Sequence, residues 1–207
     1  PAVKAIVLTG AGKAFSGGAD IREFGSPKAI QEPNLLSVIL AVENSRIPVI
    51  AAVHSVAMGG GLELALSCDM VVAARDAVFL MAYSNVALSP DGGASWSLAH
   101  TLPRPLATEL LMCGDKITAE RLHALGLVNR LSNPGDALGT ALQLADRLNH
   151  RAPNALASIK ELLSDAAHQT LSQHLNSERD HFVKNLHHPN AGEGIAAFLE
   201  KRAPRYE

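Results

Sequence analysis

The 207-residue sequence has only two cysteines, Cys68 and Cys113, and they form no Cys-x-x-Cys pair. Their number and spacing exclude a disulfide-stapled scaffold and a cysteine-based zinc motif. Both thiols lie among apolar residues. We therefore expect two buried structural cysteines in a reduced, cytoplasmic protein.

An excess of charge is also lacking, since 18 Lys and Arg residues stand against 20 Asp and Glu residues, a net charge of −2. This balance offers no electrostatic footprint for nucleic acid or an anionic membrane. The longest apolar runs, such as Ile47 to Met58, are interrupted by Pro48 and His54 and are too short to span a bilayer. Neither nucleic acid nor a membrane is therefore an expected partner.

Several common catalytic motifs are missing. The glycine loop at Gly10 and Gly12 has Phe15 where a dinucleotide fingerprint needs its third glycine, and no Gly-Lys-Ser/Thr of a P-loop follows. No Gly-x-Ser-x-Gly elbow of a serine hydrolase occurs, since the stretch from Gly93 to Ser97 lacks the closing glycine. The nine histidines show no metal-ligand spacing, so no metal site is expected.

What the sequence does contain is an alternation of short β-rich runs, glycine loops and helical patterns over residues 3–101. This alternation predicts an α/β core with a largely parallel sheet, followed by a mostly helical region. The expected strands are Val3–Leu8, Val49–Val53, Met70–Ala74, Val78–Met81 and Leu127–Leu131. The expected helices are Asn34–Ser45, one after Gly60, one after Gly92, Arg104–Met112, Ala119–Ala124, Ala137–Asn149, Asn154–Ser164 and Leu171–Leu186. We expect residues 1–150 to form the core and residues 151–207 a C-terminal helical region.

The most informative stretch is the glycine triplet Gly59-Gly60-Gly61, which ends an apolar strand and opens a helix with Glu63 in its first turn. Backbone N–H groups at a helix start have no intrahelical partner and attract negative charge, so an oxyanion is expected there. Glycine runs also serve tight turns and close helix packing. A second glycine-rich strand end, Ala11 to Ile21, makes a shared site the stronger interpretation.

Two of these segments, Ala14-Phe15-Ser16-Gly17-Gly18-Ala19-Asp20-Ile21 and Ala57 to Ala65, resemble the enoyl-CoA hydratase/isomerase (crotonase) family, as do Cys68-Asp69 and the run Glu193 to Arg202. The resemblance implies the crotonase (ClpP-like) spiral fold of ββα units with a C-terminal helical region. Family members usually begin with a further strand-and-helix segment, so this N-terminal segment is expected to be missing. The resemblance also implies that residues 151–207 take part in a homotrimer or a dimer of trimers.

In the family, two backbone amides bind the thioester oxygen of an acyl-CoA. By position these amides are Gly17 and Gly60. The residues that match the segment holding the nucleotide end of CoA are Ala14, Phe15, Ala19, Asp20 and Ile21. No cofactor is implied, because CoA is part of the substrate.

Hydratases of the family hold a water between two glutamates. Glu63 matches the first glutamate, but the second position falls on Tyr83, which is no carboxylate base and is expected only to line the substrate. A carboxylate reappears at Asp91, where dienoyl-CoA and epoxyphenylacetyl-CoA isomerases of the family carry an acid/base aspartate. The alternative is that Asp91 only caps the following helix.

The resemblance therefore implies an acyl-CoA enzyme with Asp91 as the main proton shuttle and Glu63 as the second acid/base group. Double-bond isomerisation or a related rearrangement is the expected reaction. Hydration of a 2-enoyl-CoA and an inactive acyl-CoA-binding paralogue remain alternatives. The sequence departs from the family pattern at Ser55, a position that is usually glycine in the family. The preceding residue, His54, is expected to be a core histidine with satisfied hydrogen bonds.

Overall fold

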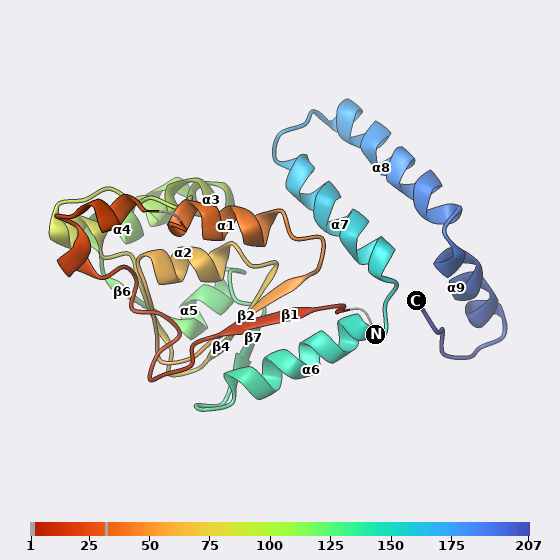
Figure 1. Cartoon of the computed structure of the whole chain (residues 1–207), viewed down its shortest axis with the longest axis horizontal. Helices are drawn as coiled ribbons and strands as arrows, with labels where there is room; N and C mark the ends of the chain where they lie inside the picture. The colour runs from red at the N-terminus through yellow and green to blue at the C-terminus, as the bar shows by residue number, and fades with distance from the viewer. Residues whose placement is uncertain (1–2, 32) are drawn as a thin grey trace. The chain divides into compact units, whose positions relative to one another are not determined.

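The central strands are built from β-branched and small apolar residues that are buried on both faces. β2 (Val49–Val53) has the sequence Val-Ile-Ala-Ala-Val, and all of its residues are buried. β4 (Met70–Ala74) pairs with β2 in parallel and is buried from Val71 onward. Continuous apolar strands of this kind are typical of parallel sheets covered on both faces. In this computed structural model, which describes residues 3–31 and 33–207, they lie at the centre of the core (Figure 1).

The strands form two sheets. The four-stranded sheet has the order β1-β2-β4-β7, with β1 (Ile6–Thr9) and β7 (Arg130–Ser132) at its edges. The three-stranded sheet has the order β3-β5-β6, in which β3 (Val56–Met58) runs parallel to β5 (Val78–Leu80) and β6 (Lys116–Thr118) antiparallel to β5. In each of the successive pairs β2-β3 and β4-β5, the first strand belongs to the four-stranded sheet and the second to the three-stranded sheet. A helix follows each pair. This repeat agrees with the spiral of ββα units that the resemblance implies.

The described helices have the following bounds. They are α1 (Leu35–Glu43), α2 (Gly60–Leu66), α3 (Ala94–Thr101), α4 (Arg104–Cys113), α5 (Ala119–Ala124), α6 (Ala137–Asn149), α7 (Pro153–Ala166), α8 (Leu171–Leu186), α9 (Pro189–Leu199) and the 3-10 helices η1 (Ile21–Glu23), η2 (Pro27–Ile30) and η3 (Tyr83–Val86). Side-chain caps begin several of them. Asn34 Oδ1 accepts the amide hydrogen of Ser37 at the start of α1, and Thr170 forms a capping box with Gln173 at the start of α8. No helix in the described part of the chain is long and apolar enough to cross a membrane.

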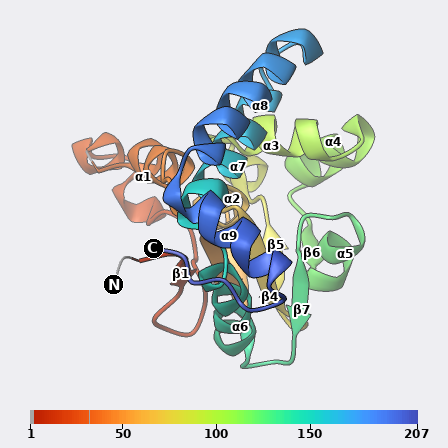
Figure 2. The ribbon, with the colours of Figure 1, turned by 90° about the vertical axis from the view of Figure 1, so that its right-hand side faces the viewer.

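The chain divides into two compact units. The core unit comprises Val7–Ser45 and Val49–Leu142, and within it α5 packs against β6 and β7 (Figure 2). The C-terminal unit comprises Arg46–Pro48 and Gln143–Glu207 with the described residues up to Ile6, and within it α7 packs on α8 and α8 on α9. The division falls inside α6, which begins in the core unit and ends in the C-terminal unit.

Five elements have the bounds expected from the sequence, whereas β7 begins at Arg130 and not at Leu127. β2, β4, α5, α6 and α8 match the predicted ranges. The first strand begins at Ile6 and not at Val3, which is 65% exposed. β6 and α9 were not predicted as elements, and β3 was expected only as the end of the apolar strand before the glycine triplet. The two strands have three residues each, too few to show a period, and α9 starts with a proline at its first helical position.

The two cysteines have different environments. Cys68 is buried, as predicted, whereas Cys113 is exposed, so the prediction of a buried thiol at that position was wrong. The reason lies in α4, whose only buried residue is Ala107. Six residues of an α-helix turn through about 600°, which places Cys113 well away from the buried side of α4.

Candidate active site

The loop that follows β1 runs alongside β3 and is fixed to it by main-chain hydrogen bonds. Ser16 N donates to Val56 O at 3.1 Å, and Met58 N donates to Ser16 O at 3.0 Å, as in a parallel bridge. One residue earlier, Phe15 N donates to His54 O at 3.1 Å. The two glycine-rich segments singled out in the sequence therefore meet in the core unit.

Glycine is required at two positions where the two segments contact each other. A Cβ on Gly61 would lie 2.5 Å from Ser16 Cβ. A Cβ on Gly18, whose φ is +83°, would lie 2.8 Å from Met58 O and 3.8 Å from Gly60 N. Side chains at either position would push the two segments apart. The loop carrying Gly17 and Gly18 thus approaches the start of α2 closely because the glycines leave room.

The amides of Gly17 and Gly60 have no hydrogen-bond acceptor among the residues that the structure describes. Gly59 caps α2 with φ 51° and ψ −122°, and the first carbonyl bond of this helix is made by Leu62 N. Gly60 precedes that donor, so its amide has no partner within α2. Over residues 3–31 and 33–207, neither Gly17 N nor Gly60 N donates to a backbone carbonyl. Gly18 N, in contrast, is used by Ser16 Oγ at 3.2 Å.

Glu63 carries the buried carboxyl group of the site. It lies in the first turn of α2 and is 2% exposed. The pKa of Glu63 is raised to about 7, chiefly by burial and also by the negative charge of Asp91, while the hydrogen bond from Tyr83 opposes this rise. Glu63 Oε1 is buried and accepts no hydrogen bond from the described residues. The side chain is therefore a carboxyl group that titrates near neutrality, and its Oε1 atom is available to accept a hydrogen bond.

Tyr83 links Glu63 to Asp91. Its hydroxyl lies 3.1 Å from Glu63 Oε2 and 3.3 Å from Asp91 Oδ1. Tyr83 is half-buried and begins η3, whereas Asp91 is exposed. Burial and the two carboxylate charges raise the pKa of the Tyr83 hydroxyl above its usual value, so it stays protonated. The residue expected only to line the substrate is thus hydrogen-bonded to both carboxyl groups.

Asp91 is not a helix cap. The following helix, α3, begins at Ala94, and its N-cap is Gly93, which has φ +98° and offers no side-chain hydrogen bond. The alternative that Asp91 only caps this helix is therefore wrong. Its side chain instead accepts a hydrogen bond from the Tyr83 hydroxyl.

Two residues of the site were missed from the sequence, Leu35 and Gly92. A Cβ on Gly92, whose φ is +63°, would lie 2.5 Å from Glu63 Oε2 and 2.9 Å from Leu35 Cδ2. A Cβ on Gly60 would lie 3.0 Å from the same leucine carbon. Leu35 therefore lies against both Gly60 and Gly92. The sequence signal was weak, because Leu35 reads as an ordinary apolar residue of α1.

Some side chains of the segment expected to hold CoA are already engaged within the protein. Ala19, Asp20 and Ile21 are exposed, Ala14 is half-buried and Phe15 is buried. Asp20 accepts hydrogen bonds from Arg22, which hold the pKa of Asp20 below its usual value. Since the Phe15 side chain belongs to the core, any contact of that residue with a ligand would have to come from its backbone.

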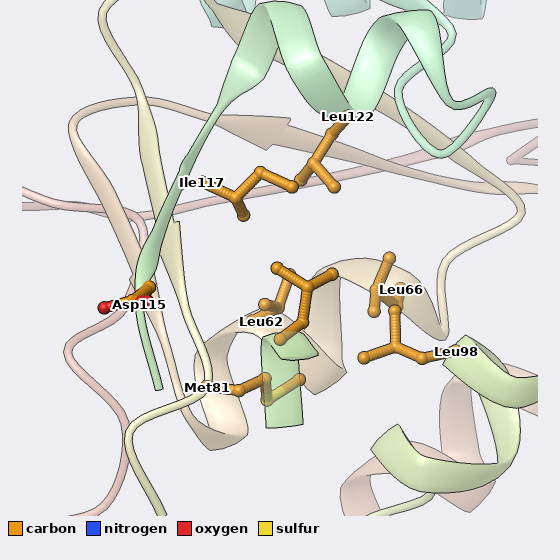
Figure 3. A pocket seen from close by; sticks show the side chains of 8 residues that line it. Leu62, Leu66, Met81, Leu98, Asp115, Ile117 and Leu122 are labelled. Atoms are coloured by element: carbon orange, nitrogen blue, oxygen red, sulfur yellow. The ribbon is translucent and has the colours of Figure 1, made fainter. Parts of the chain in front are cut away.

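A small cavity lies beneath α2 (Figure 3). It is lined mainly by aliphatic side chains, among them Leu62, Leu98 and Ile117, and its volume is about 10 Å³. A cavity of this size holds about one water molecule. It is a packing void of the core and too small for a substrate.

The described residues show no candidate metal site. Among the described residues, no three His, Cys, Asp or Glu side chains gather in a way that could hold a metal ion. The chemistry available is a buried carboxyl group, an exposed carboxylate, the phenol between them and two backbone amides, Gly17 N and Gly60 N, that donate to no acceptor among the described residues. These groups define the class as an α/β enzyme equipped for acid–base chemistry.

Comparison with known proteins identifies the family to which the chain belongs. The model of the enoyl-CoA hydratase/isomerase family matches residues 1–207. The chain is 34% identical over 212 residues to the 1,2-epoxyphenylacetyl-CoA isomerase of Escherichia coli K12, covering 99% of this chain and 81% of that protein. It is likewise 34% identical over 212 residues to a carnitinyl-CoA dehydratase of Escherichia coli, with the same coverage.

Solved structures agree with this match. The crystal structure of an enoyl-CoA hydratase from Polaromonas sp. JS666 superposes with a TM-score of 0.95 at 55% identity, covering 99% of this chain and 82% of that chain. An enoyl-CoA hydratase from Mycobacterium tuberculosis H37Rv gives a TM-score of 0.92 at 34% identity, covering 99% and 81%. The chain belongs to the enoyl-CoA hydratase/isomerase family and has the crotonase fold. It is an enzyme of the hydratase/isomerase type.

Proposed function

We propose that this enzyme shifts the double bond of an enoyl-CoA through an enolate of the thioester. The observation that carries the proposal is the cluster of Glu63, Tyr83 and Asp91, in which a buried and an exposed carboxyl group share one hydroxyl. Asp91 removes a proton from C2 of a 3-enoyl-CoA. The C2–C3 double bond forms, the C3–C4 double bond breaks, and Glu63 delivers a proton to C4.

The enolate oxygen is assigned to the amides of Gly17 and Gly60. A proton next to a thioester becomes removable only when the developing oxyanion is stabilised, and one such donor contributes roughly 3–4 kcal/mol in other enzymes. Support comes from these two amides, which have no acceptor in the described part of the chain, and from the close approach of Gly18 to Gly60 N. The segment from Ala14 to Ile21 is assigned to the nucleotide end of CoA. The reaction needs no cofactor, since CoA is part of the substrate.

Hydration of a 2-enoyl-CoA is the second candidate. It is supported by Glu63 and by the solved relatives named enoyl-CoA hydratase. Against it stands Tyr83 at the position of the second glutamate, because a phenol with a raised pKa is a poor base for water. Isomerisation is therefore the preferred reaction.

The assembly is proposed to be a homotrimer or a dimer of trimers. Large apolar side chains are exposed on the C-terminal helices, including Phe182 at 67% and Leu171 at 74% on α8 and Phe198 at 81% on α9. Apolar surface of this kind is typical of protein interfaces. The proposed setting is the cytoplasm, since Cys68 and Cys113 are both free thiols.

The test compares two reactions in three proteins. The wild type should isomerise 3-hexenoyl-CoA faster than it hydrates crotonyl-CoA. Asp91→Asn should slow isomerisation by roughly 10²–10⁴, the usual span for a general acid/base. Glu63→Gln should cost less, because solvent can protonate C4 of the dienolate in place of Glu63, and should abolish any hydration. Hydration that dominates and survives Asp91→Asn would favour the second candidate, and a wild type inactive in both assays would favour an acyl-CoA-binding role.

A further inference from the structure

The hydroxyl of Tyr83 has one hydrogen and two carboxyl neighbours. Glu63 Oε2 lies 3.1 Å away and Asp91 Oδ1 lies 3.3 Å away. A hydroxyl donates one hydrogen bond at a time but also accepts. Both contacts are therefore satisfied only when one carboxyl group is protonated and donates to the Tyr83 oxygen while the hydroxyl donates to the other.

Burial decides which carboxyl group holds that proton. Glu63 is 2% exposed, whereas Asp91 is exposed to solvent. An ionised carboxylate loses more on burial than a neutral carboxylic acid, so the proton belongs on Glu63 and the charge on Asp91. In this resting state, Glu63 donates to Tyr83 and Tyr83 donates to Asp91.

We propose that Tyr83 is a proton relay that resets Glu63 and Asp91 after each turnover. This inference rests on the proposed function. After isomerisation, Asp91 carries the proton taken from C2, and Glu63 has lost its proton to C4. The Asp91 O–H bond then breaks and a new O–H bond forms on Tyr83. In the same step, the original Tyr83 O–H bond breaks and an O–H bond forms on Glu63 Oε2, so the resting state returns without a proton from solvent.

The relay explains why a phenol suits this position. Its high pKa keeps the hydroxyl neutral, so the proton passes through without a phenolate accumulating. Gly92 lets the Glu63 carboxyl group stay within reach, because a Cβ there would lie 2.5 Å from Oε2. Tyr83 acts through the two carboxyl groups and is therefore a positioning residue.

The test is Tyr83→Phe, which removes the hydroxyl and keeps the ring. With enzyme in excess over 3-hexenoyl-CoA and at a pH below the Glu63 pKa of about 7, the first turnover should stay within about threefold of the wild type, because Glu63 starts protonated. Steady-state turnover should fall at least about tenfold, because the reset must now use solvent. Added imidazole should restore turnover in Tyr83→Phe but not in Glu63→Gln, which has no acid to reprotonate.

The chain offers a matched control. Tyr206→Phe makes the same chemical change at the other tyrosine, which lies in the C-terminal unit, and it should leave both rates unchanged. If Tyr83→Phe keeps full steady-state turnover, protons pass by another route and the relay is wrong. If first and later turnovers fall equally without imidazole rescue, Tyr83 is only structural and the relay is also wrong. A wild type without isomerase activity overturns the proposed function itself and the relay with it.

Discussion

Gly92 lies directly against the carboxyl group of Glu63, so that a Cβ at position 92 would be 2.5 Å from Glu63 Oε2. The two residues come from different segments, the loop before α3 and the first turn of α2. Their contact brings the loop that carries Asp91 to the buried carboxyl group. The geometry of the acid–base cluster therefore depends on a residue that has no side chain.

Gly92→Ala should damage both stability and activity. Its new Cβ would meet Glu63 and Leu35, and φ +63° is unfavourable for alanine. We expect a loss of about 2–4 kcal/mol in unfolding free energy and a fall in kcat, measured by urea unfolding and by isomerisation. The control is Gly93→Ala, which also has a positive φ but open space around its Cβ, and it should cost less. Equal losses of unfolding free energy and kcat in the two variants would show that a Cβ at position 92 does not clash with Glu63.

Glu63→Gln should stabilise the protein in alkaline solution. The folded-state pKa of Glu63 is raised from 4.5 to about 7, so the folded protein binds more protons than the unfolded chain between these values. The unfolding free energy of the wild type therefore falls as pH rises through this window. The variant lacks this penalty and should be more stable by about 1–3 kcal/mol above pH 7, with little difference near pH 4. A gain that does not depend on pH would contradict the raised pKa.

Ser55→Gly should also be stabilising. Ser55 has φ +58°, in the left-handed region, and joins β2 to β3. The strain of a side chain there, about 1–2 kcal/mol, exceeds the greater unfolded-state entropy of glycine, about 0.5–1 kcal/mol. Thermal unfolding should therefore show a net gain of about 0.5–1 kcal/mol. A destabilised variant would mean that the serine hydroxyl contributes more than the strain costs.

Phe182→Asp should weaken self-association. Phe182 is 67% exposed on α8, and a buried charge at an interface is costly. Sedimentation velocity should show the dissociation constant rise by at least about tenfold. Met112→Asp changes an equally exposed apolar residue of the core unit and serves as the control. A wild type that sediments as a monomer at micromolar concentration would contradict the proposed assembly.

The sequence predicted the parts of the fold that carry long, regular patterns. β2, β4 and α8 have the expected bounds, because apolar runs and helical periodicity determine them locally. The three-residue strands β3 and β6 depend on pairing with β5, a long-range contact that no local pattern reports. The left-handed conformation of Ser55 is one that favours glycine, and no local sequence pattern reported it.

The candidate site was predicted by resemblance more than by local chemistry. Glu63 and Asp91 were named, but their link through Tyr83 was not, because hydrogen-bond partners twenty and eight residues apart are set by the tertiary fold. Leu35 was missed for the same reason. His54 was expected to be a satisfied core residue, and its Nε2 lies 3.2 Å from Gly12 O in a half-buried position.

The most direct test of the account is the crystal structure of Asp91→Asn with 3-hexenoyl-CoA bound, because this variant turns over slowly and keeps the shape of the site. We predict the thioester oxygen at about 2.7–3.1 Å from both Gly17 N and Gly60 N, with C2 facing residue 91 and C4 facing Glu63. A thioester oxygen that contacts neither amide, or an acyl chain that runs away from Glu63, would contradict the enolate mechanism.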